Sequence, residues 1–228
     1  MSQPATAPVT QPATQAATEP AQPSTMPTTG PAPDLGAEVF PDTTGKAIAT
    51  IKDAPVIVVP RSAWTKAKPN LQQIALMNGI SAITVHHTAW AIDHDAWRPT
   101  ATAVENVRNF HSTTKPNGVI PNGRGWADIA YHFVIDRAGR VWQGRPLAYQ
   151  GAHVKGHNEH NLGICLLGNF DEQSPSAAQL TALGQFIHFV AKLYDVERDD
   201  IFTHGELGKT SCPGKKLQDY MNRLRKQV

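Results

Sequence analysis

The sequence predicts a mixed α/β fold, in which one central β-sheet is flanked by helices and follows a disordered N-terminal tail. Two observations support the folded part. Short runs of β-branched and aromatic residues alternate along residues 54–228 with longer segments whose apolar residues recur at helical spacing. A sheet covered by helices buries the apolar faces of such interleaved elements. With about 175 residues, this part is long enough for one sizeable core, so we expect a single domain.

The first 50 residues differ in composition from the rest. They consist largely of Pro, Thr, Ala and Gln and contain few large apolar side chains. Such a segment cannot bury enough surface to offset the entropy that it loses on ordering. We therefore interpret residues 1–50 as a disordered tail or linker.

The charge pattern indicates neither nucleic acid nor a membrane as a partner. The net charge is +2, the pI is near 8.6, and the basic residues are scattered except for a run at residues 223–226 that is typical of a solvated helix end. No stretch is long and apolar enough to span a bilayer, and the N-terminus lacks the basic start and apolar core of a secretory signal. We expect no nucleic-acid binding and no membrane span.

The first half of the domain is expected to alternate strands and helices. A β-branched run at residues 55–59 predicts an edge strand. Residues 71–77 have apolar side chains at modest helical spacing, and Asn-Gly follows them, which predicts a short helix. A strand is predicted at 83–87 and a helix at 101–111. The long loop at 112–125 is expected to form a rim or lid over a site.

The second half begins with a predicted β-hairpin. Two runs of β-formers, at residues 129–135 and 140–143, flank a short turn that ends with Gly139. Because side chains alternate along a strand, Tyr131 is expected on the same face as Phe133.

A central strand and two helices complete the prediction. Residues 162–167 are apolar without alternation, which is typical of a strand buried on both faces, and we expect Cys165 within it to be an unreactive buried thiol. Ser176 and Gln179 form a capping box before a helix that runs to Tyr194. A last amphipathic segment, residues 217–224, predicts a C-terminal helix.

A His and Cys pattern suggests a metal site. His204 and Cys212 lie eight positions apart in a segment rich in Gly and Pro, which favours a loop that aims both side chains at one point. His86 and His87 end a predicted strand, and because adjacent strand residues face opposite ways, only one of them can point at that site. Three protein ligands with one open position are typical of a catalytic zinc ion. Spacing alone leaves chance proximity open as an alternative.

Six segments carry a family resemblance. They are Arg61–Trp64, Val85–Thr88, Trp126–Phe133, Gly151–Asn158, Leu162–Phe170 and His204–Gly214. In these segments, and in their order, the chain resembles the type 2 family of N-acetylmuramoyl-L-alanine amidases, which includes animal peptidoglycan recognition proteins and amidase-type phage lysozymes. The resemblance implies that family's fold, a Zn²⁺ cofactor, and hydrolysis of the amide bond between N-acetylmuramic acid and L-alanine in peptidoglycan or muropeptides.

The resemblance also implies roles for individual residues. The zinc ligands fall on His86, His204 and Cys212, with His86 rather than His87 as the first ligand. The active-site tyrosine falls on Tyr131. Thr210 occupies a position where some members carry a lysine, and we expect it to position water or substrate. The substrate cleft is expected to include His153, His111, Trp90 and Asn158.

Further expectations follow from the same resemblance. A substrate in the wall suggests a location in the cell envelope or outside the cell, and we expect a monomer. Because Cys212 is assigned to the metal, we predict no disulfide.

Two alternatives to the enzyme remain at this point. Members of the family that recognise peptidoglycan without cutting it typically lack the metal-binding cysteine, whereas this chain has Cys212. A closed structural zinc site with His87 as fourth ligand would require a β-bulge at His86 and His87.

Overall fold

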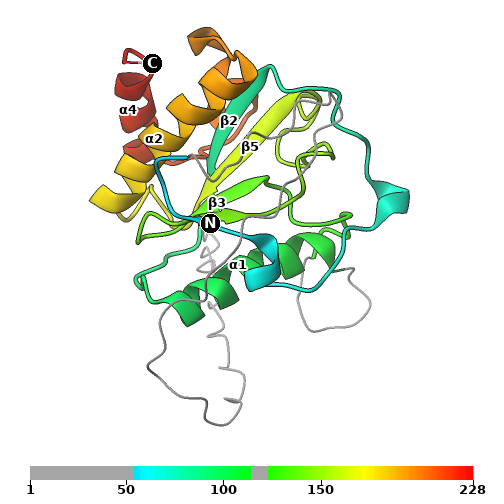
Figure 1. Ribbon diagram of the computed structural model, residues 1–228. Coiled ribbons are helices and arrows are strands. Elements are labelled where there is room, and N and C mark those ends of the chain that lie inside the picture. The colour runs from blue at the N-terminus through cyan, green and yellow to red at the C-terminus, as the bar shows by residue number, and fades with distance from the viewer. Residues whose placement is uncertain (1–53, 114–122, 228) are drawn as a thin grey trace, which may run out of the picture. The chain divides into compact units, whose positions relative to one another are not determined.

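A six-stranded mixed sheet forms the centre of the fold (Figure 1). The computed structural model describes residues 54–113 and 123–227. The strand order is β1-β4-β3-β5-β2-β6, and all neighbouring strands are parallel except β3 and β4. The strands are β1 (Val58–Val59), β2 (Ala82–His87), β3 (Phe133–Ile135), β4 (Val141–Gln143), β5 (Asn161–Leu166) and β6 (Ile201–Thr203).

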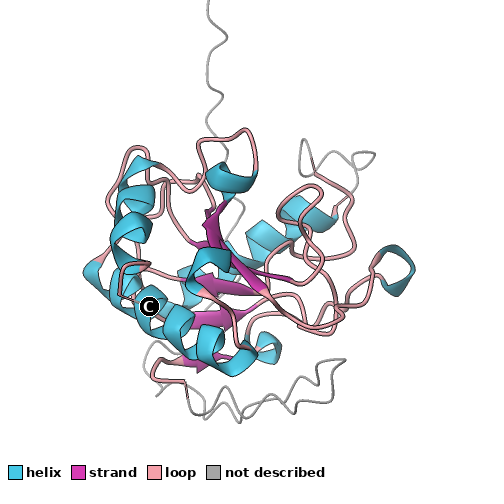
Figure 2. Cartoon of the chain, turned by 90° about the horizontal axis from the view of Figure 1, so that it is seen from above, coloured by secondary structure: helices cyan, strands magenta, loops and turns pink. Residues whose placement is uncertain are grey.

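Helices cover both faces of this sheet, which confirms the predicted fold class (Figures 1 and 2). The α-helices are α1 (Trp97–Ser112), α2 (Ala177–Tyr194), α3 (His204–Leu207) and α4 (Lys215–Leu224), and single 3₁₀ turns lie at Arg61–Ala63, Leu71–Gln73 and Arg198–Asp200. One apolar core lies between the sheet and α2 with α4, and a second lies between the sheet and α1. No helix among the described residues combines the length and the apolar character that crossing a bilayer requires.

Strand alternation divides the residues of the sheet between the two cores. Ile83 and Val85 of β2 belong to the core under α2, so Thr84 and His86 face the α1 side. In β5 all six residues are buried, as predicted for a central strand, because β5 lies between β3 and β2 and both of its faces are covered.

Several local predictions agree with the structure. The capping box of α2 is present, since the side chain of Ser176 accepts from the backbone of Gln179 and the side chain of Gln179 accepts from the backbone of Ser176. The hairpin turn between β3 and β4 is closed by Asp136, whose Oδ1 accepts from the N–H groups of Ala138 and Arg140. Both cysteines are free.

The predicted helix at residues 71–77 is wrong. Only Leu71–Gln73 form a 3₁₀ turn, and Leu76 forms an isolated antiparallel bridge with Tyr149. Leu71 and Leu76 are 64% and 56% exposed, so the apolar spacing does not describe a buried face. Pairing with a distant segment overrides a weak helical signal here.

The boundaries of two other predicted elements also differ. Helix α1 begins at Trp97 rather than at residue 101, because Trp97 packs against Trp142 at 4.9 Å between ring centroids, and Pro99 is tolerated in the first turn. The strand predicted at residues 129–135 is reduced to β3. Two backbone carbonyls before β3 accept hydrogen bonds from Arg145 instead of from a neighbouring strand: its Nε donates to Ile129 O and its backbone N–H donates to Tyr131 O.

Strand β6 was not predicted, because its three residues at the sheet edge carry almost no signal of their own. Most of the predicted rim, residues 114–122, and the predicted tail, residues 1–50, lie outside the described residues.

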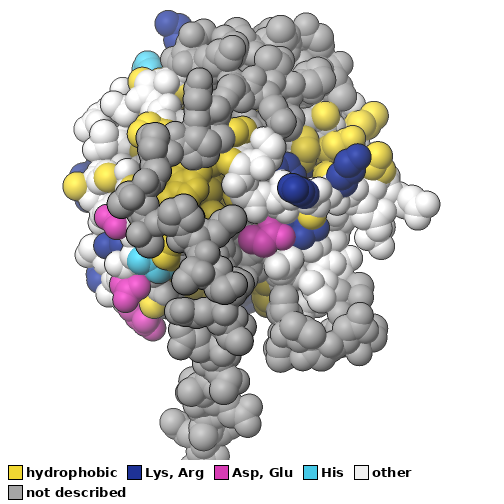
Figure 3. Space-filling view, turned by 60° about the horizontal axis from the view of Figure 1, so that its bottom comes forward, with side chains coloured by type: hydrophobic (Ala, Val, Ile, Leu, Met, Phe, Trp, Pro, Cys, Tyr) yellow, Lys and Arg dark blue, Asp and Glu magenta, His cyan; other side chains and the backbone are white. Residues whose placement is uncertain are grey.

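On the face in Figure 3, basic side chains lie among acidic, hydrophobic and uncharged ones.

Candidate functional site

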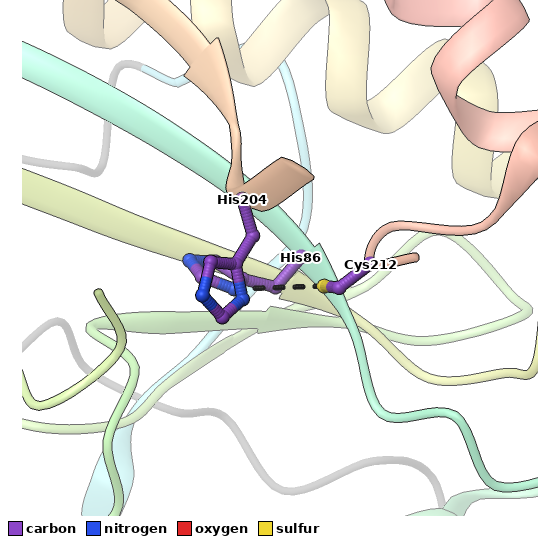
Figure 4. A group of neighbouring side chains, drawn as sticks. All are labelled: His86, His204 and Cys212. Carbon is purple, nitrogen blue, oxygen red and sulfur yellow. Dashed lines mark hydrogen bonds between the residues drawn. The ribbon is translucent and has the colours of Figure 1, made fainter. Parts of the chain in front are cut away.

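Three side chains from separate elements converge at one edge of the sheet (Figure 4). They are His86 near the end of β2, His204 at the start of α3 and Cys212 in the loop before α4. One ligand atom from each lies within 4.8 Å of those from the other two. His86 Nδ1 is 3.7 Å from Cys212 Sγ, and the His86 and His204 ring centroids are 4.8 Å apart.

The sheet register places the two histidines side by side. Val85 of β2 pairs with Thr203 of β6 in a parallel ladder, so His86 and His204 are the next residues along each strand. The carboxyl ends of parallel strands open onto the same edge of a sheet, where sites commonly form. Two residues far apart in the sequence therefore reach one point.

A helical turn and a tight return bring in the third side chain. The predicted loop between His204 and Cys212 begins as helix α3, with Thr203 and Glu206 forming a capping box. Gly205 N–H then donates to Cys212 O at 2.7 Å. A Cβ on Gly205 would lie 2.9 Å from that oxygen, so the close approach needs glycine.

His87 faces away from this cluster. Its Nδ1 accepts from Phe170 N–H at 3.2 Å, and its ring lies 6.0 Å from that of Phe170. The pairing of β2 with β5 runs without interruption through His87, so the bulge that a fourth ligand would require is absent. The closed structural site is therefore not formed.

The donor set fits zinc chemically. Burial, followed by the neighbouring His153 and His204, holds the pKa of His86 well below its usual value, and burial lowers the pKa of His204. Both imidazoles are thus neutral at pH 7, as ligation requires. Burial raises the pKa of Cys212 to about 12, although the hydrogen bond from His87 N–H acts to lower it. A bound cation is therefore needed to hold the side chain as a thiolate. Two imidazoles and a thiolate leave one tetrahedral position open.

A cleft of about 320 Å³ opens beside the cluster. One wall is aromatic: Trp90 packs edge-on against Phe110 at 5.6 Å, and Trp126 stacks on His111 at 5.1 Å. Thr210 also lines the cleft, and its Oγ1 accepts from Cys212 N–H. The cleft thus joins the predicted metal ligands to several predicted substrate residues.

Tyr131 lies between the cluster and this aromatic wall. Its ring centroid is 5.1 Å from that of His86 and 5.4 Å from that of His111. It packs with the α1 core, contrary to the predicted common face with Phe133, because the strand begins only at residue 133. Burial, followed by Cys165 and Cys212, raises the pKa of Tyr131 well above its usual value, so the hydroxyl keeps its proton.

The remaining predicted substrate residues differ in accessibility. Trp90 is 37% exposed in the cleft. His111 is buried, its Nδ1 accepts from Ala130 N–H, and burial lowers its pKa to about 3. His153 lines the cleft but is only 6% exposed, and its ring lies against that of His86. Asn158 lines an adjoining groove rather than this cleft.

Sequence reasoning did not assign Arg124, Phe110 or Trp126 to the cleft. Arg124 is the only Lys, Arg, Asp or Glu that lines the cleft among the described residues. Its guanidinium lies 5.5 Å from the Phe110 ring centroid and 5.8 Å from that of Trp126. The available signal was an Arg that stands between two glycines in a long loop, two positions before Trp126, where a side chain is more often exposed than packed.

Comparison with known proteins agrees with this geometry. The family model described as N-acetylmuramoyl-L-alanine amidase matches residues 76–215, more than half of the chain. The chain belongs to this family. Membership supports a function related to peptidoglycan.

The relatives include peptidoglycan-recognition proteins and an amidase. Peptidoglycan-recognition protein SC2 of Drosophila melanogaster is 29% identical over 164 residues, covering 71% of this chain and 83% of the relative. The N-acetylmuramoyl-L-alanine amidase of Homo sapiens is 30% identical over 169 residues, which cover 71% of this chain but only 27% of that enzyme. Among solved structures, peptidoglycan recognition protein-LE in complex with tracheal cytotoxin, a monomeric diaminopimelic acid-type peptidoglycan, has a TM-score of 0.61 and 25% identity, covering 73% of this chain and 92% of that one.

Proposed function

We propose that this protein is a zinc-dependent N-acetylmuramoyl-L-alanine amidase, which hydrolyses the amide bond between N-acetylmuramic acid and L-alanine in peptidoglycan. The observation that supports this most is the convergence of His86, His204 and Cys212 beside a cleft in a member of the amidase family. A substrate of this kind implies action at the cell envelope or outside the cell.

The proposed cofactor accounts for the hydrolytic step. A zinc ion with three protein ligands and one open position lowers the pKa of a bound water toward about 7 and polarises a carbonyl group. The two neutral imidazoles and the buried thiol are the groups of this chain that would hold it.

Tyr131 is the proposed donor to the substrate carbonyl oxygen as negative charge develops there. Its raised pKa keeps the hydroxyl protonated, and a half-buried donor whose ring packs against His86 and His111 needs no reorganisation during the reaction. Thr210 accepts a hydrogen bond from Cys212 N–H through Oγ1, which leaves its own hydroxyl proton available to orient water or substrate.

The cleft suits a glycopeptide. Trp90, Phe110 and Trp126 offer apolar ring faces against which sugar and peptide groups pack, and Arg124 offers a cation for a carboxylate of the stem peptide. The structural neighbour in complex with tracheal cytotoxin supports a muropeptide as the kind of ligand. His111 and Trp90 are the predicted substrate residues that keep this role in the proposal.

A non-catalytic recognition module is the second candidate, because several relatives and structural neighbours are named for the recognition of peptidoglycan rather than for its hydrolysis. Cys212→Ser separates the two. For an amidase, the variant stays folded and binds peptidoglycan fragments but releases no peptide from defined muropeptides, as measured by mass spectrometry. A wild-type protein that binds these muropeptides and leaves them intact in the presence of zinc would favour the module.

A further inference from the structure

His153 occupies a narrow slot between the cleft and the candidate metal centre. The residue is 6% exposed, and its ring lies edge-on to that of His86 at 5.0 Å between centroids. Gly151 and Gly163 wall the slot, because a Cβ added at either would come within 2.2 or 2.6 Å of His153 Cδ2. Packing therefore holds the ring in one orientation.

Both ring nitrogens of His153 are hydrogen-bonded. Nε2 lies 3.1 Å from the backbone oxygen of Asn161, and Nδ1 lies 3.1 Å from His86 Nε2. A carbonyl oxygen only accepts, so the proton of the neutral His153 ring is on Nε2 and its Nδ1 is an acceptor. His86 then donates from Nε2, which leaves the lone pair on its Nδ1.

That lone pair faces the other ligands. Nδ1 is the nitrogen of His86 that lies 3.7 Å from Cys212 Sγ. An imidazole binds a metal ion through its unprotonated nitrogen, and the partner of the other nitrogen decides which one that is. The Asn161 carbonyl, which can only accept, thus fixes the tautomer of His153, and His153 in turn fixes the tautomer of His86.

We propose that His153 is a positioning residue, which holds His86 in the tautomer that binds the metal ion through Nδ1. The inference rests on the proposed function for the identity of the metal. With both nitrogens occupied inside the protein, His153 offers no free ring N–H to a substrate, in contrast to the role first expected from the family resemblance.

The turn before β5 supports this arrangement. Asn158 Oδ1 accepts from His153 N–H at 2.8 Å and from Val154 N–H at 2.9 Å. The Asn161 side chain donates to His157 O and accepts from Thr84 Oγ1. Asn158, also expected to bind substrate, therefore has its side-chain oxygen committed to the turn that carries His153.

The first test reads the tautomers directly. Proton–nitrogen correlation spectra of the ¹⁵N-histidine-labelled, metal-free full chain at neutral pH distinguish a protonated Nδ1 from a protonated Nε2. We expect His86 and His153 both to carry the proton on Nε2. A protonated Nδ1 on His86 would overturn the inference. Because this readout needs neither zinc nor activity, its failure is distinct from failure of the proposed amidase function.

The second test measures zinc affinity by competition with a fluorescent chelator. His153→Leu removes the acceptor and is expected to weaken zinc binding by about 10- to 100-fold, whereas His153→Asn keeps an acceptor near the Nδ1 position and loses less. His132→Leu is the matched control, since His132 is also buried but bonds to Gly163 N–H and Tyr149 O instead of a ligand.

The outcomes of the second test separate positioning from substrate contact. Weaker zinc binding in His153→Leu, with KM unchanged at saturating zinc, supports the positioning role. Wild-type zinc affinity with a raised KM for muropeptides would overturn it. If the wild-type chain takes up no zinc at all, the proposed function fails, and the tautomer spectra still decide the inference.

Discussion

Replacing Gly163 with Ala is expected to weaken zinc binding without altering any proposed ligand. An added Cβ would lie 2.6 Å from His153 Cδ2, whereas ordinary Cβ contacts begin at 3.4 Å, so the ring has to recede by about 0.8 Å. The His86–His153 hydrogen bond is 3.1 Å long, and a displacement of this size is enough to break it. We expect a stability loss of about 1–3 kcal/mol from overpacking and a loss in zinc affinity of about 10- to 100-fold.

Urea unfolding and chelator competition measure the two effects in Gly163→Ala. Gly208→Ala is the control, because its added Cβ would meet the His204 ring at 3.4 Å, an ordinary contact, and its backbone is extended with φ −150°. The control is expected to resemble the wild type in both assays. If Gly163→Ala also keeps wild-type stability and zinc affinity, the slot does not hold His153 as argued.

Further predictions concern the cleft, the cofactor and the pH dependence of stability. Tyr131→Phe is expected to lower kcat on muropeptides by about 10²- to 10³-fold while the chain stays folded, and an unchanged kcat would remove Tyr131 from the mechanism. Arg124→Gln is expected to raise KM for muropeptides with a free stem carboxylate more than for amidated ones, and equal effects on both would argue against the assigned contact. Dialysis against a chelator is expected to abolish hydrolysis and zinc to restore it, as followed by mass spectrometry of the products; activity that survives complete metal removal contradicts the proposal. Burial raises the pKa of Glu206, but hydrogen bonds from Arg225 and the Thr203 backbone outweigh it and lower the pKa below its ordinary value of 4.5. The stability that this provides is present above pH 4.5 and is lost as the pH falls through the lowered pKa, so Glu206→Gln should destabilise the chain in urea at pH 7 but not once Glu206 is protonated in acid.

Much of the fold follows from local patterns. The capping box starts α2 where Ser176 and Gln179 predict it, and the unbroken apolar run predicts the buried β5. Such signals suffice because the bonds involved join residues a few positions apart. The predicted helix at residues 71–77 failed for the opposite reason, since its backbone pairs with a segment around Tyr149 that no local pattern identifies.

At the candidate site, too, the local pattern predicted some side-chain directions correctly and misplaced another. The two-residue period of a strand was enough to put His86 and His87 on opposite faces, and the family resemblance indicated His86 as the one that joins the cluster. The same period misplaced Tyr131, because the ladder begins at residue 133 and the chain before it turns toward α1.

By itself the sequence determined the fold class and the best-marked elements, since these depend on spacing within a segment, and through its family resemblance it indicated the His and Cys residues of the cluster. Only the tertiary structure decided that His204 follows a short edge strand next to β2, and that His153 meets His86 across 67 positions of the chain. The physical reason is that strand order and register, set by the packing of the whole sheet between two layers of helices, choose which distant side chains share a face and an edge.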